Sequence, residues 1–157
     1  MQLGTVLATV IGALVGLLVT LLTNATKWYL DRGDRWEGYK KEAFTDCLAA
    51  FNVTQQEIFA LAVDDNLLAM EGQRGEKVRA AFAGNGLLKS YELVLLLGED
   101  DVGAAAETAF QRLRGLRDKV AEGRGDNDPK HKEMSIEYAE ALSKLRKSMR
   151  KELRKRR

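Results

Sequence analysis

The 157-residue chain contains only one cysteine, one proline and one histidine. The single Cys47 cannot form an internal disulfide, which is typical of a protein kept in a reducing compartment. A zinc site needs about four Cys, His or acidic ligands, and the sequence does not group such a set. With 14 glycines against one proline, we expect long regular elements that are interrupted at glycine.

Catalytic patterns are equally scarce. His131 has no nucleophile beside it, and Cys47 lies on an apolar helical stripe, where a buried structural thiol is expected. The acids from Glu99 to Asp101 are consecutive, whereas calcium ligands alternate around a tight loop, so helix capping is the favoured interpretation. We therefore expect a non-enzymatic protein with no cofactor and no metal site.

Charge is absent from the N-terminal stretch between Gly4 and Asn24. The apolar run over residues 3–23 would be ~30 Å long as a helix, which matches the hydrocarbon thickness of a bilayer. A cleaved signal peptide would have a basic start, a shorter apolar segment and a small-residue cleavage site. We therefore predict a transmembrane anchor over residues 1–26 in preference to a cleaved signal.

Aromatic and cationic residues follow this run where a membrane interface is expected: Lys27, Trp28, Tyr29, Arg32 and Arg35. Because cations follow the run and none precedes it, the positive-inside rule predicts a single-pass protein of the plasma (inner) membrane, with its N-terminus outside and its C-terminal domain cytoplasmic. Gly33 and Gly38 indicate a juxtamembrane linker or hinge over residues 27–38.

Small residues recur at every fourth position of the predicted anchor: Gly4, Ala8, Gly12, Gly16 and Thr20. Gly12 and Gly16 form a GxxxG pair, which permits close approach of two membrane helices. Two interpretations stay open at this point. The row is a contact with a second copy or a larger membrane protein, or it is a set of small residues that faces lipid.

For the rest of the chain, residues 39–157, the sequence predicts an all-α antiparallel bundle of about four helices that ends in a basic helix. The segment after Asp34 has an apolar stripe at helical spacing, which is expected to be buried: Phe44, Cys47, Leu48, Phe51, Ile58, Leu61 and Ala62. The opposite, solvent-facing side is assigned Lys40, Lys41, Asp46, Gln55 and Gln56.

The later segments follow the same logic. Residues 87–97 could pass for a strand, but a lone strand has no partner, and their apolar spacing (Leu87, Leu88, Tyr91, Val94, Leu95) fits a helix. Gly98 is a helix stop, and Asp128 with Pro129 is a helix start. The expected inward stripes of the last two helices are Val102, Ala106, Ala109, Leu113, Leu116 and Val120, then Tyr138, Leu142, Leu145, Met149 and Leu153.

Three stretches follow the apolar N-terminal helix: "RWEGYKKEAFTDCLAAFN", "YELVLLLGEDDVGAAAETAFQRL" and "RKSMRKEL". In these stretches the chain resembles a group of uncharacterised small actinobacterial single-pass membrane proteins with a helical cytoplasmic domain. The resemblance implies a membrane-anchored helical domain, and it brings no activity, cofactor or functional residue.

Nine Lys or Arg and one Glu occupy residues 144–157. Three interpretations remain open: a solvated helix end, a contact with anionic lipid, or binding to nucleic acid or an acidic partner. The tail lacks aromatic residues for base stacking, so nucleic acid is the least favoured. The lipid interpretation names Arg150, Lys151, Arg154, Lys155, Arg156 and Arg157.

The leading hypothesis is a membrane-anchored helical interaction or scaffold protein, with membrane lipid as a partner. The alternative is a membrane-acting effector or regulator, of the toxin or defence type, that assembles through its transmembrane helix.

Overall fold

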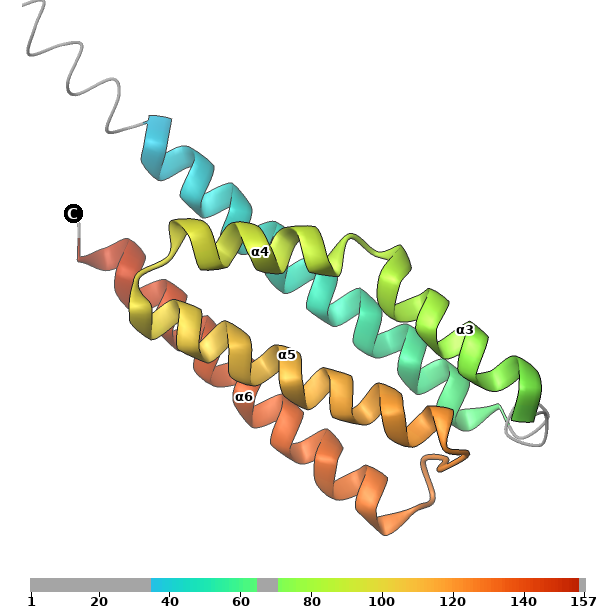
Figure 1. Ribbon diagram of the computed structural model, residues 1–157. Coiled ribbons are helices and arrows are strands. Elements are labelled where there is room, and N and C mark those ends of the chain that lie inside the picture. The colour runs from blue at the N-terminus through green and yellow to red at the C-terminus, as the bar shows by residue number, and fades with distance from the viewer. Residues whose placement is uncertain (1–34, 65–70, 156–157) are drawn as a thin grey trace, which may run out of the picture. The chain divides into compact units, whose positions relative to one another are not determined.

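The computed structural model describes residues 35–64 and 71–155, which form five helices and contain no strand. A helix over residues 35–63 is followed by α3 (Glu71–Gly84), α4 (Leu87–Leu97), α5 (Asp100–Ala121) and α6 (Pro129–Arg154) (Figure 1). The all-α class is therefore confirmed. None of these five helices is long and apolar enough to cross a bilayer. The predicted anchor, with its row of small residues, lies outside the described residues.

The chain divides into two compact units, residues 1–39 and 40–157. In the first unit, residues 35–39 are described; they are helical and expose the side chains of Trp36 and Tyr39. Gly38 lies within this helix without a break. The last four residues of the predicted linker are thus helical, and the boundary between anchor and linker stays a prediction.

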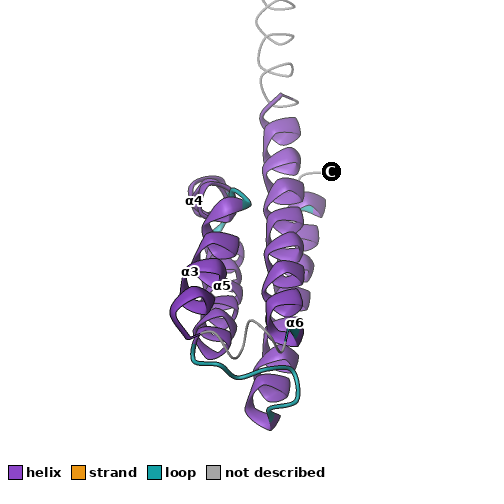
Figure 2. Ribbon diagram, turned by 90° about the vertical axis from the view of Figure 1, so that its right-hand side faces the viewer, coloured by secondary structure: helices purple, strands orange, loops and turns teal. Residues whose placement is uncertain are grey.

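The second unit is a bundle built around the contact between α5 and α6. Both α3 and α4 pack against α5, and they follow one another along the same side of the unit (Figure 1). Figure 2 shows α3, α4 and α5 on one side, with α6 and the helix over residues 35–63 on the other. The five described helices therefore occupy about four positions of a bundle, because α3 and α4 share one of them.

Two predicted helix boundaries are confirmed by hydrogen bonds. Asp128 caps α6, since its Oδ1 accepts the backbone N–H of Lys130 at 2.7 Å, and Pro129 takes the first helical position. Gly98 ends α4, and its N–H donates to the Val94 carbonyl at 2.8 Å. Glu99 precedes α5 without a side-chain capping bond, so this part of the capping prediction was wrong. Asp100 and Asp101 lie in the first turn of α5, where acidic residues are favourable to the helix dipole.

The core consists largely of the predicted stripes. Buried along the helix over residues 35–63 are Phe44, Cys47, Phe51, Ile58 and Ala62, and the predicted stripes of α5 and α6 are buried apart from Leu153, which is partly exposed. Aromatic rings connect α3 and α4 to α5. The Phe110 ring stacks on Tyr91 with 4.5 Å between centroids and lies 5.5 Å from Phe82.

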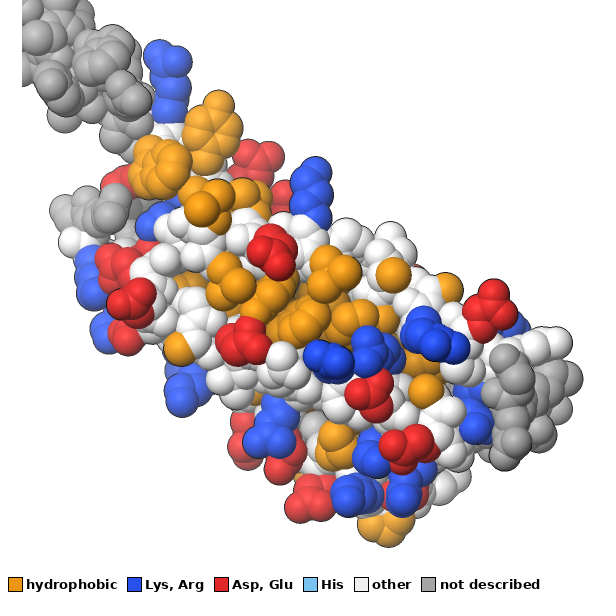
Figure 3. Space-filling view, viewed as in Figure 1, with side chains coloured by type: hydrophobic (Ala, Val, Ile, Leu, Met, Phe, Trp, Pro, Cys, Tyr) orange, Lys and Arg blue, Asp and Glu red, His pale blue; other side chains and the backbone are white. Residues whose placement is uncertain are grey.

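The helix predicted over residues 87–97 is confirmed as α4. Leu87, Tyr91 and Val94 are buried, whereas Leu88 and Leu95 are half-exposed. The reason is that one side of α4 packs on the bundle, while its sequence is apolar on nearly all sides. Hydrophobic side chains consequently gather over α4 (Figure 3). The exposed leucines of this helix are at positions 88, 93, 95 and 96.

A buried hydroxyl without a partner gives a stability prediction. The Thr54 side chain is 0% exposed, and its Oγ1 has no hydrogen-bond partner among the described residues. Replacing it in Thr54→Val removes the desolvated hydroxyl and keeps the shape, so the free energy of unfolding should rise by about 1 kcal/mol. Urea unfolding of the full chain in a mild neutral detergent, followed by circular dichroism, measures this change.

The matched control is Thr108→Val, because the Thr108 hydroxyl is exposed and donates to the Ala104 carbonyl at 2.8 Å. That variant should leave the unfolding midpoint nearly unchanged. A Thr54→Val protein that is less stable than the wild type would show that the hydroxyl is satisfied.

Candidate functional site

The C-terminal turns of α6 are joined to two other segments by a buried ion pair. Lys40 Nζ donates to Glu152 Oε1, and the two side chains are 7% and 3% exposed. The second carboxylate oxygen of Glu152 accepts the backbone N–H of Glu99 at 3.0 Å. Glu152 therefore connects the helix over residues 35–63, α6 and the turn between α4 and α5.

This arrangement corrects one prediction. Lys40 was assigned to the solvent-facing side of its helix, but it lies on the buried side, in line with Phe44 and Cys47. A buried lysine requires a partner that satisfies its charge. Glu152, 112 residues later in the chain, is that partner, and sequence periodicity alone does not reveal such a distant contact.

Two exposed ion pairs lie beside the buried one. Lys151 Nζ is 3.1 Å from Asp101 Oδ2, and Lys155 Nζ is 2.7 Å from Glu99 Oε2. The hydrogen bond from Lys151 holds the pKa of Asp101 below its usual range, and the bond to Glu99 raises the pKa of Lys155. Glu99, just before α5, and Asp101, in its first turn, thus form ion pairs with the basic tail.

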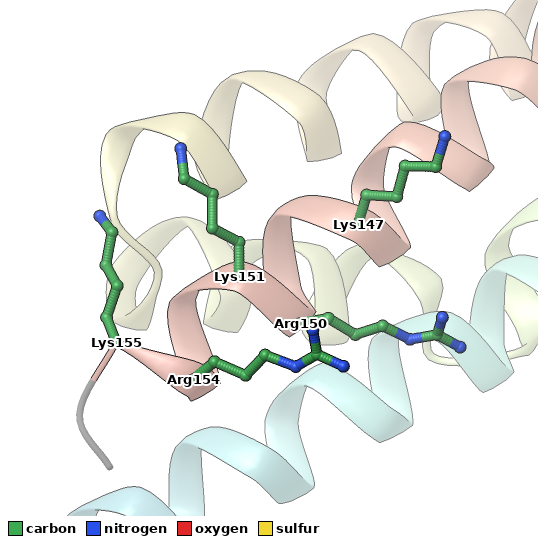
Figure 4. Close-up of a pocket in the computed structure, with 5 residues that line it drawn as sticks. All are labelled: Lys147, Arg150, Lys151, Arg154 and Lys155. Carbon is green, nitrogen blue, oxygen red and sulfur yellow. The ribbon is translucent and has the colours of Figure 1, made fainter.

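Five cations gather around a shallow hollow of about 470 Å³ on α6, which we call the basic hollow: Lys147, Arg150, Lys151, Arg154 and Lys155. Figure 4 shows the three lysines on one side of α6 and the two arginines on another. The lysines follow an i, i+4, i+8 row, and so lie one above another on the helix.

These five cations are not equivalent. Lys151 and Lys155 are paired with carboxylates of the α4–α5 turn and the start of α5. Lys147, Arg150 and Arg154 form no ion pair with any residue in the described part of the chain. The basic hollow can therefore offer two guanidinium groups and one ammonium group to an anionic ligand without first breaking an ion pair.

The predicted lipid-contact residues fall into two groups. Arg150, Lys151, Arg154 and Lys155 are brought together in the basic hollow, whereas residues 156 and 157 lie outside the described part. Lys147 was missed, although its spacing of four from Lys151 was a readable signal. Among the predicted membrane-interface residues, Arg35 is exposed on its helix, and those at positions 27, 28, 29 and 32 lie outside the described residues.

The two residues considered for catalysis are both buried. Burial raises the pKa of the Cys47 thiol to about 12, so the thiol keeps its proton at neutral pH. Burial also lowers the pKa of His131, against the opposing effect of Asp126 and Asp128. Within residues 35–64 and 71–155, no group of three His, Cys, Asp or Glu side chains is placed to hold a metal ion.

Comparison with known proteins gave no match among protein-family models, curated proteins or solved structures. The resemblance drawn from the sequence accordingly stays a prediction.

The buried ion pair predicts non-additive stability changes. Lys40→Met leaves the Glu152 carboxylate buried without its cation, and Glu152→Leu does the reverse, so each single variant should lose about 3 kcal/mol or more of unfolding free energy. The double variant leaves no unpaired charge, but it still lacks the acceptor for the Glu99 N–H, so it should recover part of that loss. Urea unfolding of all three proteins provides the double-mutant cycle.

Lys151→Met is the control for this cycle, because it removes an exposed pair on the same helix and should leave the stability nearly unchanged. Additive losses in the double variant would contradict the proposed coupling.

Proposed function

We propose that this protein is a membrane-anchored, non-enzymatic interaction or scaffold protein whose helical bundle stands at the cytoplasmic face of the plasma membrane. The anchor is the uncharged run over residues 3–23. The observation that carries the proposal is the position of the basic hollow within the second unit. Lys40, the first residue of that unit, pairs with Glu152 in the last turns of α6, so the chain enters the unit at the end that carries the cations.

This placement suits a cytoplasmic membrane surface. Cations close to an anionic leaflet are each attracted by about 1 kcal/mol, and the attraction falls off within a Debye length. An entry point and a basic hollow at the same end of the unit therefore act together. The exposed rings of Trp36 and Tyr39, shortly after the anchor in the chain, are of the type that settles at the membrane–water interface.

The surface of α4 supports an interaction role. It exposes Leu88, Leu93, Leu95 and Leu96, the last of them 80% exposed. Solitary exposed leucines are ordinary, but several on one helix are typical of surfaces that meet a partner. Neither the cations nor the leucines form an arrangement of nucleophile, base and oxyanion donors, which a hydrolytic enzyme would require.

Membrane fractionation tests the anchor. The full chain should stay in the membrane pellet after washing with alkaline carbonate and with high salt, because an inserted helix is held by the hydrophobic effect and not by charge. A variant with Gln at residues 150, 151, 154 and 155 should pellet equally well, since its anchor is intact. Release of the wild-type protein by either wash would overturn the proposal.

A membrane-acting effector that assembles through its anchor is the second candidate, favoured by the row of small residues at every fourth position. If this row is a helix contact, Gly12→Ile and Gly16→Ile together should prevent close approach and abolish self-crosslinking in membranes. The matched control is Val10→Ile with Val15→Ile, which adds bulk off the row. Crosslinking that persists in the glycine double variant would remove this candidate.

A further inference from the structure

A groove of about 450 Å³ runs between α6 and the helix over residues 35–63. Its floor is apolar and consists of Phe44, Leu48, Met149 and Leu153, of which Phe44 and Met149 are buried and the other two partly exposed. A groove of this size is within the range of small-molecule sites. Its occupant should therefore have an apolar part that covers this floor.

The rim of the same groove is cationic. Lys41 belongs to one wall, and Arg146 and Arg150 belong to the other. The Arg146 guanidinium donates to Asn52 Oδ1 at 3.0 Å across the groove, which holds it in place. Among the described residues that line the groove there is no Asp or Glu, so the lining itself carries only positive charge.

We infer that this groove binds one anionic membrane phospholipid, with the phosphate held by Arg146 and Arg150, which lie one turn apart on α6, and an acyl chain lying on the apolar floor. The inference rests on the proposed function, which places the bundle at a lipid surface. Charge complementarity selects an anionic headgroup, since arginine guanidinium groups bind phosphate oxygens through paired hydrogen bonds. A zwitterionic headgroup adds a cation, which the three rim cations would repel.

A second feature favours lipid over an acidic protein segment. Arg150 lines both the groove and the basic hollow, so cations continue from the groove onto the outer surface of α6. A lipid in the groove would thus be one molecule withdrawn from the same anionic leaflet that attracts the basic hollow.

The test uses the full chain, extracted in a neutral detergent and incubated with equal amounts of phosphatidylglycerol and phosphatidylcholine. Native mass spectrometry then counts the lipids that remain bound. We expect one phosphatidylglycerol per chain to be retained at least tenfold more often than phosphatidylcholine. Equal retention of the two lipids would overturn the inference.

Ala49 is a suitable position for a test because its small, exposed side chain lines the groove. Ala49→Glu places a carboxylate beside the proposed phosphate and should reduce phosphatidylglycerol retention by about tenfold or more. Ala49→Gln adds the same bulk without charge and should retain most of the lipid. Both residues are good helix formers, so neither should unfold the helix.

Arg150→Gln should also lose the preference, whereas a variant that combines Arg114→Gln with Lys132→Gln, two exposed cations away from the groove, should keep it. Retention by Ala49→Glu equal to that by Ala49→Gln would overturn the site. A different outcome would identify a protein partner in place of lipid. In that case the wild type would show no preference between the two lipids, and an acidic protein would crosslink to the wild type but not to Arg150→Gln.

Fractionation of the same variants separates the two proposals. If every variant stays in the carbonate-washed membrane while lipid retention is unaffected by Ala49→Glu, the groove assignment fails and the anchor stands. If the wild-type protein is itself released from membranes, the proposed function fails.

Discussion

The buried pair between Lys40 and Glu152 determines how the end of the bundle that carries the basic hollow is built. Removing two charges from water costs several kcal/mol per ion unless the geometry is good and the remaining oxygens are satisfied. Both oxygens of Glu152 are used, one by Lys40 and one by the Glu99 N–H. Three segments that are distant in sequence are thereby held in one register, and a slip of any of them would leave a charge or a backbone N–H buried without a partner.

The charged surface follows from that register. Because Met149 and Glu152 face inward, helical geometry sends Arg146, Arg150 and Leu153 to the flank beside the helix over residues 35–63. It sends Lys151 and Lys155 to the flank beside α5, where they meet Asp101 and Glu99. Two of the lysines on the α5 flank are thus paired with carboxylates, whereas Arg146 and Arg150 on the other flank form no ion pair with a described residue, and the groove lies on the arginine side.

The periodicity of the sequence predicted the features that depend on local sequence. It did not predict the burial of residues whose environment depends on a contact distant in the sequence. The stripes of α5 and α6, the Asp128–Pro129 start and the Gly98 stop were all readable, because each reflects spacing or capping within one helix. The burial of Lys40 and the exposure of Leu88 were not, since they depend on which neighbour covers each face. The cluster of cations was visible in the sequence, but their division into paired and unpaired groups required the position of the α4–α5 turn.

One side chain, Arg150, borders two hollows at once. Its single positive charge contributes to the potential in both, so an anion bound in one lowers the attraction that the other exerts on a second anion. Thermodynamic linkage makes this effect mutual and equal in both directions. An anion bound in the groove would consequently lower the affinity of the basic hollow for an anionic leaflet. The two sites would then show negative cooperativity.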